Sequence, residues 1–124
     1  MATDYSPIYQ PGQAISRTTS ADVTAGQLLY VSGSDTVAKT SGATAAWLGV
    51  AAFSAASGSD VTVLCGGVHQ LAASGAISAG ALVIPDANGA VQTIGSATAT
   101  TDSQIVGVAL SDAASSLVVV KLAR

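Results

Sequence analysis

The sequence predicts an all-β protein, a small closed or partly open β-barrel built from two related halves, with an extended N-terminal arm. Three observations predict it. Short runs of Val, Ile and Leu alternate with turn residues, one sequence pattern occurs twice, and a Pro-containing segment precedes both copies. The chain has 124 residues, of which 49% are hydrophobic. That length suits one domain with one core, and that composition argues against disorder over most of the chain.

Short runs rich in Val, Ile and Leu, separated by turn residues, are typical of barrel or sandwich strands. The predicted strands are residues 27–31, 36–39, 47–53, 61–65, 68–71, 82–84, 91–94, 105–110 and 117–122. Asn88 and Gly89 between two of these runs indicate a hairpin, because both residue types tolerate positive φ. All seven acidic residues are Asp and none is Glu, which disfavours helix.

The repeat is the most informative feature of the sequence. Residues 23–29 (VTAGQLL) match residues 77–83 (ISAGALV), 54 positions later, and residues 48–51 (LGVA) match residues 106–109 (VGVA), 58 positions later. Each copy continues through Ala and Ser into another apolar run. The conserved order of these elements favours duplication over chance similarity. We expect two half-barrels stacked about a pseudo-twofold axis, which would bury both apolar sets and close the sheet edges.

Residues 1–20 differ from the rest, so we divide the chain into an extended arm at 1–20 and a barrel domain at 21–124. Pro7 and Pro11 disfavour helix and central strands. Tyr5, Ile8 and Tyr9 give the arm apolar groups to bury, whereas purely solvating tails are poor in aromatics. A disordered terminus without a role is the alternative.

The charge pattern excludes several classes of function. Only 9% of residues are charged and the net charge is −3, so the chain lacks the clustered Lys and Arg that nucleic acids and anionic membranes require. The N-terminus does not resemble a signal peptide, and the apolar runs are too short to cross a bilayer. Cys65 is the only cysteine, which excludes an intrachain disulfide and fits assembly in a reducing cytoplasm.

No set of reactive residues in the sequence indicates an enzyme or a bound cofactor. Cys65 and His69 would be the only nucleophile pair, but Cys65 continues the alternation of Val61 and Val63 and is expected to face the core. His69 is expected at the surface or in an interface. A zinc site needs three or four Cys or His ligands, the Asp residues are spread singly over turns, and no phosphate-binding loop occurs. We therefore predict no catalytic, cofactor-binding or metal-binding residues.

The aromatic residues of the barrel domain are expected in its core. Tyr30, Trp47 and Phe53 all fall within or at the end of predicted strands. A carbohydrate-binding platform built on Trp47 is the weaker alternative, because such platforms use exposed aromatic faces.

Several segments together resemble the capsid decoration, or cement, proteins of tailed bacteriophages, once grouped as a domain of unknown function. The resemblance covers about residues 10–122. It is carried by residues 25–28, 48–51, 60–63 and 66–68, by the pair 76–83 and 86–91, and by the ending 105–110 with 117–121. It implies a compact β-barrel, often trimeric, that binds outside the capsid at local threefold positions and has no catalytic residues.

The resemblance also implies partners and a location. We expect a non-enzymatic structural protein that binds the major capsid protein, forms a homotrimer, and stabilises the shell from the outer surface of the virion after assembly in the host cytoplasm. The residues expected to contact the capsid are those of the arm: Tyr5, Pro7, Ile8, Tyr9 and Pro11. The alternative is a β-structured module of a phage tail or fibre, or a carbohydrate-binding module.

Overall fold

The computed structural model describes residues 14–94 and 103–124, which form ten β-strands and, within these ranges, no α-helix. The strands are β1 (Ile15–Thr19), β2 (Leu28–Gly33), β3 (Thr36–Lys39), β4 (Trp47–Ala51), β5 (Asp60–Leu64), β6 (Val68–Ala72), β7 (Leu82–Pro85), β8 (Val91–Thr93), β9 (Gly107–Ala109) and β10 (Leu117–Leu122). All nine predicted strands are present, which confirms the all-β prediction.

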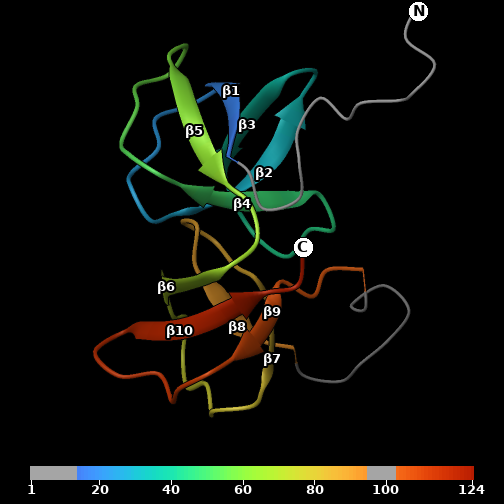
Figure 1. Ribbon diagram of the computed structural model, residues 1–124, viewed down its shortest axis with the longest axis vertical. Coiled ribbons are helices and arrows are strands. Elements are labelled where there is room, and N and C mark those ends of the chain that lie inside the picture. Colours follow the sequence, from blue (N-terminus) through green and yellow to red (C-terminus); the bar gives the residue numbers. More distant parts are fainter. Residues whose placement is uncertain (1–13, 95–102) are drawn as a thin grey trace, which may run out of the picture.

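The strands form two groups, which we call the first half (β1–β5) and the second half (β6–β10). The first half is a closed barrel in the order β1-β3-β2-β4-β5, and the second is a five-stranded sheet in the order β6-β10-β9-β7-β8. Figure 1 shows the two groups stacked along the long axis of the molecule, with β4 at the boundary between them.

Strand β1 is a barrel strand that the sequence analysis placed in the arm. It pairs antiparallel with β5 and parallel with β3, and these two pairings close the barrel. Thr19 at its end is buried, and its hydroxyl donates to the carbonyl oxygens of Ala56 at 2.7 Å and Ser59 at 3.0 Å. The expectation that barrel strands begin only after residue 20 is therefore wrong. The arm itself stays a prediction, because residues 1–13 lie outside the described ranges.

The two halves share one strand topology, as the internal repeat predicts. In the first half β5 pairs with β1 and β4, β2 with β4 and β3; in the second half β10 pairs with β6 and β9, β7 with β9 and β8. The parallel pairing Thr19↔Val37 that closes the first half corresponds to a single parallel bridge, Ala73↔Val91, in the second. The second half is thus a barrel of the same design whose last seam is reduced to one bridge.

The interior of each half is built from equivalent residues. Six pairs of equivalent side chains fill the two interiors; all twelve are apolar, and none is more than 4% exposed. The equivalent pairs are Val23 and Ile77, Leu29 and Val83, Val37 and Val91, Ala51 and Ala109, Val61 and Val118, and Val63 and Val120. Inward positions alternate with outward ones along each strand, as in β5, where Val61 and Val63 are buried and Asp60 is exposed. The duplication is therefore present in the packing as well as in the strand order.

The halves meet through surfaces that are not equivalent. The outer side of the first half, which we call the β2–β4 face, consists of Leu28, Thr40, Trp47 and Val50. It packs over one end of the second half, which we call the second mouth and define by four buried residues: Leu71, Pro85, Ala90 and Val106. Leu28, Trp47 and Val50 share one buried cluster with Leu71 and Val106. A twofold axis would bring identical faces together. The expected pseudo-twofold stacking is therefore wrong, and the halves follow one another head to tail.

The turn between β7 and β8 fastens this contact with backbone groups. The Leu28 N–H donates to the Gly89 carbonyl oxygen at 2.9 Å, and the Gly89 N–H donates to the Thr40 carbonyl oxygen at 3.1 Å. The buried Thr40 hydroxyl donates to the carbonyl oxygen of Asp86 at 2.7 Å. Buried polar groups that are all paired in this way fix one relative position of the halves.

The C-terminal residue of the second half also reaches across the boundary. The Arg124 guanidinium lies 4.2 Å from the centre of the Trp47 ring, and its Nη2 donates to the carbonyl oxygen of Ala45 at 2.7 Å. A guanidinium over an indole face is a favourable cation–π arrangement. The indole Nε1 of Trp47 is buried without a hydrogen-bond partner, so the stacked Arg124 is the polar contact that this ring makes in the described residues.

Two equivalent glycines are required where neighbouring strands approach closely. A Cβ on Gly49 would overlap the carbonyl oxygen of Leu64, and a Cβ on Gly107 would overlap the carbonyl oxygen of Lys121. We expect Gly49→Ala and Gly107→Ala each to lower the free energy of unfolding by at least about 2 kcal/mol. Gly42→Ala is the control, because no atom lies within 4 Å of its Cβ position. It should change stability by less than about 0.5 kcal/mol. Urea denaturation measures all three, and equal midpoints would contradict the close approach.

Candidate functional site

The five residues predicted to contact a partner lie outside the described residues, so their role stays a prediction: Tyr5, Pro7, Ile8, Tyr9 and Pro11. Their position along the chain is nevertheless informative. The first described strand is β1, and Ile15, the first residue of β1, lines a cavity of the first half. The cavity therefore lies beside the first described strand, which makes it the first place to look for a binding surface.

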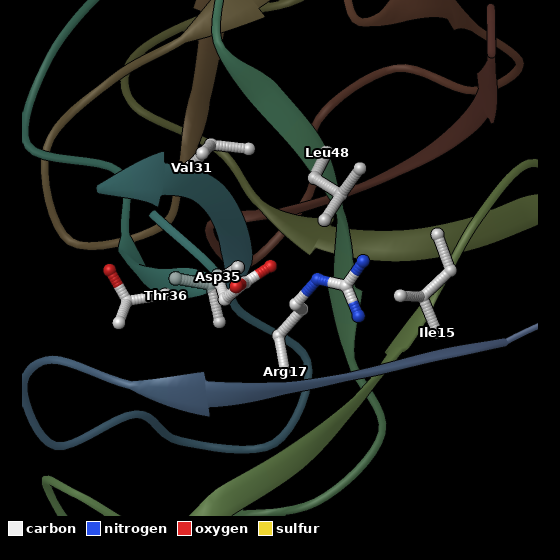
Figure 2. A pocket seen from close by; sticks show the side chains of 7 residues that line it. Ile15, Arg17, Val31, Asp35, Thr36 and Leu48 are labelled. Atoms are coloured by element: carbon white, nitrogen blue, oxygen red, sulfur yellow. The ribbon is translucent and has the colours of Figure 1, made fainter. Parts of the chain in front are cut away.

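The cavity is the open end of the first barrel, which we call the first mouth. It has a volume of about 270 Å³ and is lined by Ile15, Arg17, Val31, Asp35, Thr36, Val37 and Leu48. These residues come from β1, β2, β3, β4 and the β2–β3 turn, so the fold brings together four strands and one turn. In Figure 2 the Arg17 side chain extends toward Leu48, with Ile15 on one side and Asp35 on the other.

The first mouth combines an apolar floor with a few polar groups at its rim. Val31 is 47% exposed, and Leu48 and Ile15 are half-buried. The Arg17 Nη1 donates to the carbonyl oxygen of Ser16 at 2.8 Å, and Asp35 is exposed on the turn with a φ of 60°. Its lining contains no cysteine, serine or histidine. This chemistry suits the docking of apolar side chains with a polar rim rather than a reaction.

Cys65 and His69 lie beside a second hollow, but they do not form a reactive pair. Burial raises the pKa of the Cys65 thiol, which disfavours the thiolate that a nucleophile needs. The thiol packs against the core of the first half, as expected, 3.9 Å from the carbonyl oxygen of Val63. The His69 Nε2 lies 2.8 Å from the carbonyl oxygen of Gly66. The thiol thus contacts the backbone of β5, and the imidazole contacts the backbone of the segment that joins the two halves.

Several aspartates cap turns, in agreement with the sequence analysis. An Oδ1 of Asp22 accepts from the Ser57 N–H at 2.8 Å, and an Oδ1 of Asp112 accepts from the Ala79 N–H at 2.7 Å. Within residues 14–94 and 103–124, no three His, Cys, Asp or Glu side chains gather in a group able to hold a metal ion. The described part of the chain also has no helix of the length and hydropathy needed to span a bilayer.

Exposed apolar side chains are the surface feature that the sequence analysis missed. Six large ones are between 41% and 55% exposed: Val31, Phe53, Val68, Leu82, Leu110 and Leu117. Phe53 was expected in the core, but β4 ends at Ala51 and Phe53 falls in the bend that follows. Trp47 is buried as expected and presents no exposed ring face for a sugar. Strand alternation alone shows that one side of each strand faces outward, but not whether a neighbour covers it.

Comparison with solved structures supports the observed architecture. The chain is similar to the crystal structure of head fiber gp8.5 N base in bacteriophage phi29, with a TM-score of 0.67 and 19% sequence identity. The similarity covers 90% of this chain and 93% of that chain. At this identity the similarity shows a shared fold. No curated protein matches the sequence significantly.

The sequence comparison goes further than the shared fold. The profile of a family described as phage cement protein matches residues 9–123, which is nearly the whole chain and includes both halves. This confirms the resemblance to phage capsid decoration proteins. The chain belongs to the phage cement protein family.

Proposed function

We propose that this protein binds the outer surface of a phage capsid and stabilises the shell without catalysing a reaction. Membership of the phage cement protein family makes it a structural protein of the phage head, and this match over residues 9–123 is the observation that carries the proposal. The proposal is also supported by a surface with exposed apolar side chains and by a Cys65–His69 pair whose polar groups are engaged by the backbone.

The physical mechanism is that of a rigid clip. A shell under internal pressure fails where neighbouring subunits separate, so a body bound to several subunits adds a binding free energy that must be lost first. The clip has to be stiff for this to work. The contacts of Thr40, Gly89 and Arg124 across the boundary between the halves supply that stiffness.

We propose that the partner is the major capsid protein and that this chain acts as a homotrimer on the outer face of the virion. Three linked copies multiply weak individual contacts through effective concentration. Assembly in the host cytoplasm is consistent with the free thiol of Cys65, which stays reduced there.

The predicted arm extends the reach of the clip. Residues 1–13 span at most about 43 Å when fully extended, at roughly 3.3 Å per residue, enough to reach a neighbouring subunit. An extended segment adds a strand to an exposed sheet edge, and its side chains fill adjacent pockets. Ordering costs about 1–2 kcal/mol per residue, while a fully buried Tyr or Ile returns about 1.5–3 kcal/mol. Backbone pairing with the capsid and the multiplicity of copies would make the balance favourable.

A module of a phage fibre is the second candidate, favoured by the fold that the chain shares with a head fiber base. A carbohydrate-binding role is disfavoured, because Trp47 is buried under Arg124. One experiment separates the two phage roles. Purified protein is added to mature capsids that lack it, and sedimentation and the temperature of capsid disruption are measured. Cosedimentation with a higher disruption temperature supports the cement role, and binding without any stabilisation contradicts it.

Removal of the arm should weaken capsid binding and leave the barrel folded. The deletion covers residues 2–13 and stops before β1, because β1 closes the first half. We expect an unchanged circular dichroism spectrum and at least about tenfold weaker cosedimentation with capsids. The variant Tyr5→Ala, Ile8→Ala, Tyr9→Ala keeps the length and should lose most of the same affinity. Equal binding by truncated and full-length protein would show that the barrel surface makes the contact.

Capsid binding should not depend on Cys65 or His69. Cys65→Ser places a hydroxyl in a half-buried apolar position and should cost about 1 kcal/mol of stability. His69→Ala loses the contact with the Gly66 carbonyl oxygen and should cost about 0.5–1.5 kcal/mol. Both variants should cosediment with capsids as the wild type does. Loss of binding by either variant, once folded, would mean that the pair has a functional role.

A further inference from the structure

We infer that copies of this chain associate head to tail, by repeating between molecules the contact that joins the two halves within one molecule. In this interface the first mouth of one copy is covered by the outer β7–β9 face of the next. We define the β7–β9 face as Leu82, Ile94, Ile105 and Val108. The inference deepens the homotrimer part of the proposed function and rests on it, because it names the surfaces that would meet.

The first half supplies a mouth without a cover. In the second half the mouth is buried under the β2–β4 face, and Leu71 and Val106 are fully buried there. The equivalent residues of the first mouth, 54 and 58 positions earlier, are Arg17 and Leu48. Both are only half-buried, and they line an open cavity of about 270 Å³. One mouth of this design is therefore closed by a neighbouring half, while the other has no counterpart within the described chain.

Within the described residues, the β7–β9 face of the second half is partly exposed, although the equivalent β2–β4 face is buried. The β2–β4 residues Leu28 and Val50 pair across two strands and are buried against the second half. Their equivalents, Leu82 and Val108, form the same strand pair, yet Leu82 is 41% exposed and Val108 is half-buried. The neighbouring position Thr40 is replaced by Ile94, and its N–H donates to Leu82 O as Thr40 N–H donates to Leu28 O, both at 3.0 Å.

The β2–β3 turn of one copy would contact the β7–β9 face of the next, and at this contact the small and the large side chain have changed places. Within the molecule, Gly89 at the tip of the β7–β8 turn packs so closely on Gln27 that a Cβ on Gly89 would lie 2.6 Å from the Gln27 Cβ. In the proposed interface the tip residue is Asp35 and the residue opposite is Ala81. The larger residue has moved to the tip and the smaller to the face. Replacing Gln27 by Ala81 removes a Cγ from this contact but keeps the Cβ, so two copies must stand slightly further apart at the turn than the two halves do.

The charged group in the first mouth also has a place in this interface. Arg17 occupies the position of Leu71, and the face that would cover it carries Ile105 where the β2–β4 face carries the larger Trp47. In the proposed interface the long Arg17 side chain thus meets Ile105, which is shorter than Trp47. Asp35 lines the same cavity, so that a carboxylate is available to the guanidinium when water is excluded. A contact between two different surfaces propagates from copy to copy and closes as a ring when the rotation permits.

Paired cysteines test the geometry directly. In a Cys65→Ala background, one batch of protein carries Asp35→Cys and a second carries Ala81→Cys. A Cβ on Gly89 would lie 2.6 Å from the Gln27 Cβ. A disulfide needs about 3.5–4.5 Å between its Cβ atoms, so the slightly wider spacing expected between copies brings the two cysteines within reach of each other. Under mild oxidation the mixture should give a covalent dimer, and neither batch alone should give one. Homodimers within a single batch, or no dimer in the mixture, would overturn the head-to-tail geometry, even if light scattering shows a trimer.

A substitution pair tests the energetics. Leu82→Asp places a charge on the β7–β9 face and should weaken association at least about tenfold, as measured by light scattering over a dilution series. Leu117→Asp is the matched control, because both leucines are 41% exposed and each is the first residue of its strand. It should leave association unchanged. A wild-type protein that stays monomeric overturns both this inference and the homotrimer. Association that survives Leu82→Asp but is lost on deletion of residues 2–13 assigns the first mouth to the arm instead.

Discussion

The packing of the β2–β4 face over the second mouth is the contact on which the molecule depends. Either half alone is a small barrel with one open end, and apolar residues at that end face water. The open end of the second half is closed by the first half. Its residues Leu28, Trp47 and Val50 form a single cluster with Leu71 and Val106 of the second half. Because the burial of apolar surface drives folding, this shared cluster makes one cooperative body out of two similar halves.

Much of the fold was predictable because strand and repeat signals are strong in this chain. The nine predicted strands are present because Val, Ile and Leu runs separated by Gly, Ser and Asn report burial and turns directly. β1 was missed because its sequence, ISRTT, has one large apolar residue. The internal repeat nevertheless predicts β1. β6, 54 positions later, implies an equivalent strand, and the parallel bridge Ala73↔Val91 has its counterpart in Thr19↔Val37.

The mode of contact between the halves and the candidate site were less accessible. A repeat shows which residues are equivalent, but it does not show which faces meet. That choice depends on side-chain volumes on strands distant in sequence, such as Gly89 against Gln27. The first mouth was missed for the same reason, since Ile15, Val31 and Leu48 come from three strands and share a cavity only after closure. Phe53 was misplaced because a strand end, not its hydrophobicity, decides its exposure.

The unequal sharing of the core gives folding a direction along the chain. The first half closes its own seam with β1, β3 and β5, and its interior residues form a separate cluster. The second half draws on Leu28, Trp47 and Val50 to complete its cluster, and its seam is a single bridge. During synthesis the first half emerges earlier and is able to fold as a unit. We therefore expect the second half to fold against the first, with the N-terminal copy of the duplication acting as a scaffold for the C-terminal copy.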